Sequence, residues 1–139
     1  MWRKLEKFEK ALEDYNFIIS IHPDNLKALI NRAFCLAKLE NYDEAVIDYS
    51  SVIELEPNNI HALYNRAISF DKINQLNEAI GDFTRIIELE SMNANAYLNR
   101  GCCYEKYTLS NFRLQKLDLA YKDYEASLLI DKILENMEH

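Results

Sequence analysis

Apolar side chains recur every three or four positions along the chain, which is the period of an amphipathic α-helix. Two such stripes follow one another between positions 26 and 55: Leu29, Ala33, Leu36, and then Tyr42, Ala45, Tyr49, Val52 and Ile53. Polar breaks at Glu40-Asn41 and Asn74-Gln75 separate the stripes of a pair, and Pro57-Asn58-Asn59 separates one pair from the next. Because Pro ends a helix and Asn caps one, the pattern predicts pairs of helices with short connections.

The helix pair repeats at a constant offset, which is the spacing from Asn31 to Asn65 and again from Asn65 to Asn99. The matching segments are Pro23-Asp24-Asn25 with Pro57-Asn58-Asn59; Asn31-Arg32-Ala33 with Asn65-Arg66-Ala67 and Asn99-Arg100-Gly101; and Val52-Ile53-Glu54-Leu55-Glu56 with Ile86-Ile87-Glu88-Leu89-Glu90. Small residues at Ala33, Ala45, Ala67 and Ala79 let helix backbones approach, while Tyr49 and Phe83 fill the neighbouring space. One helix pair cannot bury its apolar face, so the repeats are expected to stack.

These residues carry a resemblance to a known family. The spacing of Leu29, Ala33, Tyr42, Ala45, Tyr49, Val52 and Pro57, which recurs as Leu63, Ala67, Leu76, Ala79, Phe83, Ile86 and Ser91, resembles the tetratricopeptide repeat. The resemblance covers nearly the whole chain. It implies an all-α fold, a right-handed superhelical solenoid of about four helix pairs, in which the first helices line a concave groove. The expected single domain spans 1–139, with repeats at 1–25 (partial), 26–59, 60–93 and 94–134.

The first repeat is shortened. Trp2 and Leu5 stand where a first helix would end, and a complete second helix runs from Phe8 to Pro23. This suggests a fragment of a longer protein, or a domain start.

The last repeat is lengthened. Its second stripe begins at Leu117, whereas the constant offset from Leu76 in the preceding repeat would place it at Ser110. Seven residues are therefore added near 107–116. They are close to two helical turns and could lengthen both helices almost in phase. The alternative is a projecting loop from Thr108 to Phe112, whose Ser and Asn suit a turn.

Residues 131–139 follow the last stripe. They are expected to continue the last helix and to cover the open end of the stack, because the terminus of a solenoid requires a cap.

The resemblance also implies which residues face the groove and bind a partner: Lys27, Asn31, Phe34, Lys38, His61, Tyr64, Asn65, Ile68, Lys72, Asn95, Leu98, Asn99 and Lys106, with Ile30 and Cys102 on the same face. Asn31, Asn65 and Asn99 would form a ladder along the groove. Their amides could bind the backbone of an extended peptide, or they could bond between helices and fix the register of the repeats.

Three further residues recur, Arg32, Arg66 and Arg100. They are expected to pair with Asp48, Asp82 and Asp123 in the second helix of each repeat and so to stabilise the scaffold. Such regular recurrence is what packing requires, whereas ligand contacts usually differ between repeats.

Some family members bind acidic chaperone tails through a clamp of two lysines, two asparagines and an arginine. Asn65 matches the middle asparagine. The other four places hold Ile30, Phe34, Asn95 and Asn99, so clamp-type binding is the less favoured alternative.

Composition narrows the classes of partner and of function that remain. A net charge of −7 disfavours nucleic acid and anionic membranes as partners. Two glycines, Gly81 and Gly101, are too few for a phosphate loop, and no nucleophile, base or paired carboxylates form a catalytic constellation. Cys35, Cys102 and Cys103 are expected to be reduced structural thiols, and no cysteine or histidine cluster predicts a metal or cofactor.

The sequence therefore predicts a soluble, cytoplasmic, non-enzymatic scaffold or adaptor that binds a peptide or helix of another protein in its groove. The alternative is an architectural segment of a longer superhelix, or a module that self-associates through its ends. Exposed apolar residues such as Trp2, Leu5 or Leu134 would favour that alternative.

Overall fold

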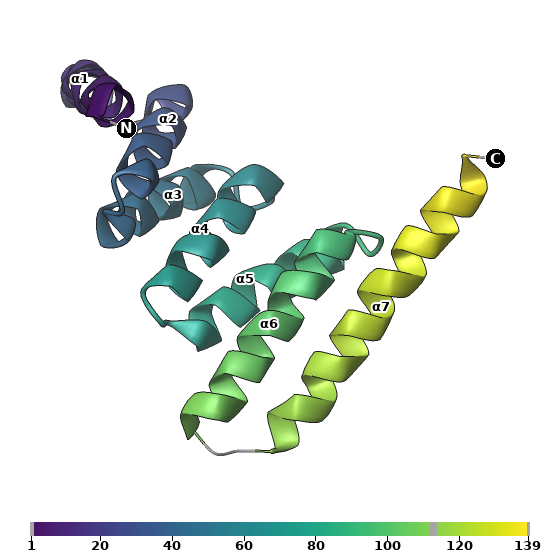
Figure 1. The fold of residues 1–139 in the computed structure, drawn as a ribbon. Helices are drawn as coiled ribbons and strands as arrows, with labels where there is room; N and C mark the ends of the chain where they lie inside the picture. Colours follow the sequence, from purple (N-terminus) through teal and green to yellow (C-terminus); the bar gives the residue numbers. More distant parts are fainter. Residues whose placement is uncertain (1, 112–113, 139) are drawn as a thin grey trace. The chain divides into compact units, whose positions relative to one another are not determined.

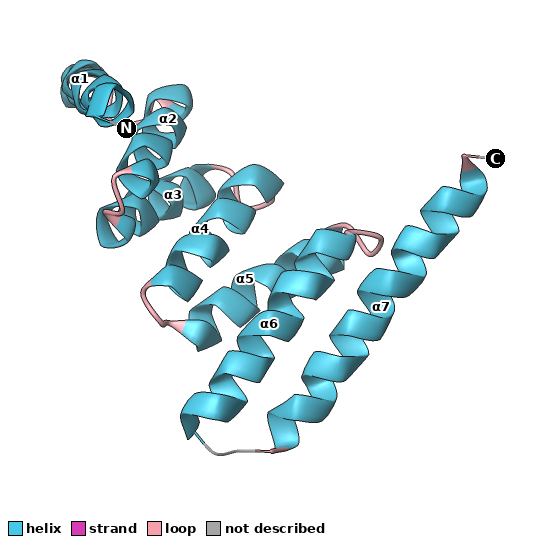
Figure 2. Cartoon of the chain, viewed as in Figure 1, coloured by secondary structure: helices cyan, strands magenta, loops and turns pink. Residues whose placement is uncertain are grey.

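The computed structural model describes residues 2–111 and 114–138, with side chains from residue 4 onward. They form helices joined by short loops (Figure 1; Figure 2): α1 (Trp2–Ile21), α2 (Leu26–Lys38), α3 (Tyr42–Leu55), α4 (Ile60–Lys72), α5 (Leu76–Leu89), α6 (Ala94–Asn111) and α7 (Gln115–Met137). The chain divides into two compact units, Met1–Ile73 with α1 to α4 and Asn74–His139 with α5 to α7. Successive helices pack together within each unit. The all-α fold and the predicted helix breaks are confirmed, while a single domain over 1–139 stays a prediction.

Asparagine begins the first helix of each regular pair. The Oδ1 atoms of Asn25, Asn59 and Asn93 accept hydrogen bonds from backbone N–H groups three residues later, at 3.0, 2.9 and 3.0 Å. The Nδ2 atoms of Asn59 and Asn93 also donate to the carboxylates of Glu56 and Glu90. Such a cap stabilises a helix by about 1 kcal/mol. The predicted capping role is thus confirmed.

The turns after α2 and after α4 each have one residue in the left-handed region. Glu40 has φ 62° and Asn74 has φ 61°. After α2, the N–H of Glu40 donates to the carbonyl of Ala37, and the N–H of Asn41 donates to that of Leu36. These bonds satisfy the last carbonyls of the helix and turn the chain sharply into α3.

The core of the first unit is built from the predicted apolar stripes. The buried cluster consists of Leu29, Ala33, Leu36, Ala45, Tyr49, Val52 and Ala62, with Leu12, Ile19, Leu26, Ile30, Ala37 and Ile53 packed against it. Ala33 and Ala45 have no exposed surface, so the helices approach closely there, and the Tyr49 ring is 1% exposed. In the second unit, Ala79 and Phe83 are likewise fully buried. Each large buried side chain contributes roughly 2 kcal/mol of hydrophobic free energy.

The first repeat differs from its prediction. α1 runs without a break from Trp2 to Ile21, so Leu5 does not end a separate helix. The physical reason is that neither Gly nor Pro occurs between 2 and 21, and nothing there stops the helix. The side chain of Trp2 lies outside the described residues.

The seven added residues lengthen two helices. α6 continues past Lys106, the counterpart of the last residue of α4, to Asn111. α7 begins at Gln115, two residues before Leu117, the counterpart of the first residue of α5. Five residues on α6 and two on α7 therefore account for the whole insertion.

The projecting loop is consequently wrong, since Thr108 to Asn111 are helical, and Phe112 lies outside the described residues. Addition of nearly two turns keeps the apolar face in phase, and Thr108 is 6% exposed and Ala120 fully buried.

The end of α7 continues past Ile130, as predicted, to Met137. Every residue from 131 to 138 is nevertheless exposed. Leu134 is 43% exposed and Met137 75%, so the expected role of covering an open end is wrong for the described part of this segment. His139 lies outside the described residues.

Candidate functional site

A depression of about 190 Å³ opens between α2 and α4 of the first unit. Its lining residues are Phe34, Ala37 and Lys38 of α2, Tyr42 and Tyr49 of α3, and Asn65, Ile68, Ser69 and Lys72 of α4. Five of these were predicted to face the groove. The structure therefore brings predicted residues from two first helices together around one hollow, with the tyrosines supplied by the second helix between them.

A second depression of about 340 Å³ lies between α1 and α2 and is lined by Lys7, Phe8, Ala11, Tyr15, Asn31, Phe34 and Cys35. Most of its residues are counterparts, one repeat earlier, of the first set: Phe8 of Tyr42, Tyr15 of Tyr49, Asn31 of Asn65, Phe34 of Ile68, and Cys35 of Ser69. The same depression is thus built twice, one repeat apart.

The sequence analysis missed the α1 wall of this surface. Phe8 and Tyr15 belong to the second helix of a repeat, and only first helices were expected to face the groove. Tyr42 and Tyr49 of α3, one full repeat later, line the other depression and were missed for the same reason. The constant offset relates the two sets of rings once one set is known to lie on this surface.

Phe34 lies at the boundary of the two depressions and lines both. Its ring meets that of Phe8 edge to face, with centroids 6.1 Å apart at an interplanar angle of 71°. The ammonium of Lys38 lies 5.2 Å from the Phe34 centroid. These contacts hold an aromatic ring that is still 45% exposed.

The other predicted residues of the first unit also lie on accessible surface. Lys27 and Asn31 line a further hollow, of about 240 Å³, with Tyr15. His61 is exposed and Tyr64 half-buried. Those on α6 are Asn95, Leu98 and Lys106, which are exposed, and Asn99, which is half-buried. Because α6 belongs to the second unit, the place of these four in the same surface stays a prediction.

Two of the ladder asparagines bond within their own helix. Nδ2 of Asn65 donates to the carbonyl of His61 at 2.8 Å, and Nδ2 of Asn99 donates to that of Asn95 at 2.8 Å. The amide oxygen of Asn65 makes none of these bonds. The bonds orient the side chains, and both suggested roles, ligand binding and register, stay predictions.

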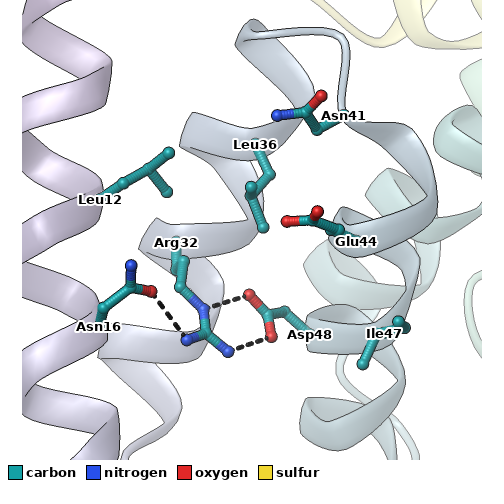
Figure 3. A pocket seen from close by; sticks show the side chains of 8 residues that line it. All are labelled: Leu12, Asn16, Arg32, Leu36, Asn41, Glu44, Ile47 and Asp48. Carbon is teal, nitrogen blue, oxygen red and sulfur yellow. Dashed lines mark hydrogen bonds and ion pairs between the residues drawn. The ribbon is translucent and has the colours of Figure 1, made fainter.

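The recurring arginines form the predicted ion pairs in both units. Nε and Nη2 of Arg32 donate to the two carboxylate oxygens of Asp48, both at 2.7 Å, and Nη1 donates to Oδ1 of Asn16 at 3.0 Å (Figure 3). Nε and Nη2 of Arg100 donate to Asp123 at 2.8 and 2.7 Å. These hydrogen bonds to carboxylates raise the pKa of Arg32 and of Arg100.

The third pair, Arg66 with Asp82, would join residues of different units and stays a prediction. Within the first unit, Nη1 of Arg66 donates to Oγ of Ser50 at 3.1 Å. This bond corresponds to that of Arg32 with Asn16, one repeat earlier.

Burial sets the electrostatics of the depression walls. It raises the pKa of the Tyr49 hydroxyl to about 12, with a smaller contribution from Asp48. Burial also raises the pKa of the Cys35 thiol. Both groups are therefore neutral near pH 7, and the walls present uncharged surface between the lysines at the rims.

The described residues contain no group of three or more His, Cys, Asp or Glu side chains that could hold a metal ion. Gly81 and Gly101 lie inside α5 and α6. Cys35, Cys102 and Cys103 form no disulfide among the described residues, and Cys102 is partly exposed. No helix in the described part of the chain is long and apolar enough to cross a membrane.

Comparisons with known proteins agree with this architecture. Residues 26–59 and 61–90 match two family models that are both described as Tetratricopeptide repeat. No curated protein sequence matches the chain.

Among solved structures, the chain is similar to MamA, with a TM-score of 0.80 and 21% identity over 92% of this chain and 71% of that one. A MamA fragment from Desulfovibrio magneticus RS-1 gives a TM-score of 0.78 and 16% identity over 94% of this chain and 70% of that one. At these identities the likeness shows the fold and transfers no partner.

Proposed function

The chain belongs to the tetratricopeptide repeat family, and on this premise we propose that it is a protein–protein interaction module that binds a peptide or helix of a partner. The observation that carries the proposal is the duplicated depression on the first unit. A surface that repeats its own pattern of ring, amide and apolar wall suits a ligand that is itself a repeating polymer, such as a polypeptide.

The chemistry of the depressions supports a ligand with apolar side chains. Phe34 and Ile68 hold equivalent places in the two hollows, so each hollow has an apolar wall beside an asparagine. An apolar ligand side chain would occupy each hollow. The amide oxygen of Asn65 would accept a hydrogen bond from the ligand backbone.

The charges at the rims favour acidic residues next to those anchors. Lys7, Lys38 and Lys72 line the depressions, although the chain as a whole carries −7. A partner segment with carboxylates would be attracted locally, and its binding would weaken as salt is added.

Affinity capture from a cell lysate tests the proposal. The native chain is compared with a double variant, Phe34→Ala with Ile68→Ala, and with a control, Leu55→Ala, whose side chain is 52% exposed on α3 and lines neither depression. Circular dichroism first checks that all three are folded. Capture by the native chain and the control, but not by the double variant, supports the groove. Equal capture by all three contradicts it.

A second candidate function is self-association, which exposed apolar residues at α1 and α7 favour. Leu5 is 43% exposed on α1, and Leu128 and Leu129 are 70% and 59% exposed on α7. Sedimentation of the native chain and of Leu129→Glu distinguishes this role. A dimer that the substitution dissociates supports it, and a monomer at all concentrations contradicts it.

A further inference from the structure

Another hollow, of about 340 Å³, opens among α1, α2 and α3 (Figure 3). It is lined by Leu12 and Asn16 of α1, Arg32 and Leu36 of α2, and Asn41, Glu44, Ile47 and Asp48 of α3 and the turn before it. None of these residues lines the two groove depressions. The hollow is therefore a separate site, and it does not rest on the proposed groove.

The Arg32 guanidinium is among the groups that line this hollow. Its edge is bonded to Asp48 and Asn16, which leaves the flat faces for further contacts. The walls are apolar on two sides, since Leu12 and Leu36 stand beside it, and Ile47 is 64% exposed. A cationic face between apolar walls is suited to an aromatic ring.

The other repeats show what normally lies beside this arginine. The counterparts of Leu36, one and two repeats later, are Phe70 and Tyr104. The Phe70 centroid lies 5.5 Å from Cζ of Arg66, and the Tyr104 centroid lies 5.9 Å from Cζ of Arg100. The repeat at 26–59 has leucine at this position, so the chain itself provides no ring from α2 to stack on Arg32.

We propose that this hollow binds an aromatic side chain of a partner protein, whose ring stacks on Arg32 as Phe70 and Tyr104 stack on their own arginines. The carboxylate of Glu44 points toward Leu36 and the hollow (Figure 3). It accepts a backbone N–H of the partner, or the hydroxyl when the ring is that of tyrosine. The chain's own rings identify the occupant as a protein side chain, because they place the same chemical group against the same cation.

The probe is N-acetyl-phenylalaninamide, titrated into ¹⁵N-labelled chain and followed by backbone chemical shifts. N-acetyl-leucinamide is the matched control, since it is apolar but lacks the ring. The proposal requires shifts at the amides of the lining residues with the phenylalanine probe, and binding several-fold weaker with the leucine probe. Equal binding of both probes, or shifts confined to other surfaces, overturns it.

Two variants locate the binding. Leu36→Phe supplies the missing ring from within, so it is expected to keep or raise the unfolding temperature and to abolish the shifts. Ile47→Ala removes one wall at an exposed position and weakens binding about five-fold, whereas Leu55→Ala on the same helix leaves it unchanged. A large drop in unfolding temperature for Leu36→Phe shows that no ring fits and overturns the proposal. Unaltered binding in Ile47→Ala does the same.

Discussion

At the scale of the residue, Arg32 and Arg100 each connect three helices. Arg32 lies on α2 and bonds to Asp48 on α3 and to Asn16 on α1. Arg100 repeats this on α6, with Asp123 on α7 and Oγ1 of Thr84 on α5. The carboxylates are buried, and the two-pronged bonds from the guanidinium groups provide hydrogen-bond donors to both oxygens of each carboxylate.

Arg32→Ala is expected to lower the free energy of unfolding by about 2–4 kcal/mol, because Asp48, 3% exposed, loses its partner. Arg85→Ala is the control. It breaks a surface pair with Glu88 in which both side chains are about half exposed, and its expected cost is below about 0.5 kcal/mol. Urea unfolding of both variants measures the difference. Equal losses would show that burial of Asp48 has no energetic role.

Tyr49 makes stability depend on alkaline pH. Its pKa is raised to about 12 in the folded chain from an ordinary value of 10.0. Stability from the neutral hydroxyl is therefore complete below pH 10 and is lost as the pH rises toward 12. The loss is on the order of 2 kcal/mol. Tyr49→Phe should lose correspondingly less stability between pH 9 and about 11.5.

Chemical unfolding at several pH values checks this expectation. Phe is tolerated at the equivalent place, where Phe83 is fully buried, so the variant should fold. Tyr121→Phe, at a side chain that is 57% exposed, is the control and should follow the native chain. An identical pH profile for Tyr49→Phe and the native chain would contradict the account.

At the scale of the element, the two glycines differ in the space that is available for a methyl group. A Cβ at Gly101 of α6 would lie 2.8 and 2.9 Å from ring carbons of Tyr124, and 3.2 Å from the carbonyl oxygen of Ala120. A Cβ at Gly81 of α5 would meet no atom within 4 Å. Gly101 thus permits the close approach of α6 and α7, while Gly81 only weakens its helix.

Gly81→Ala is expected to raise the free energy of unfolding by about 0.5–1 kcal/mol, through helix propensity. Gly101→Ala should lower it by about 1–3 kcal/mol, because overpacking outweighs the same gain. Thermal unfolding of both variants gives opposite signs if the α6–α7 contact is as close as described. A stabilised Gly101→Ala would contradict that packing.

Element boundaries were predictable where residue type and period agreed, as at Pro57 and Asn59. The insertion was not decided by its sequence, because seven residues preserve the helical phase equally well as added turns or outside the helices. The helix break near Leu5 was inferred from the resemblance. It was wrong, because the residues of α1 form one uninterrupted helix. The hollow beside Arg32 depends on the size of the Leu36 side chain relative to its neighbours. The period of the apolar positions carries no information about side-chain volume.

At the scale of the whole molecule, the first unit carries two surfaces of different chemistry. One repeats a ring, an asparagine and an apolar wall, with lysines at the rim. The other presents the face of a bonded arginine. The first was expected as a face from the resemblance to the tetratricopeptide repeat, although its α1 wall was missed. Its depth and its duplication emerged only from the packed helices.

The most direct test of the groove is site-specific photocrosslinking in a cell lysate. A photoreactive phenylalanine analogue replaces Phe34, which lines both depressions, or in a control replaces Leu55, which lines neither. The account predicts a partner adduct from position 34 that an excess of the native chain suppresses, and none from position 55. An adduct from position 55 and none from position 34 would contradict it.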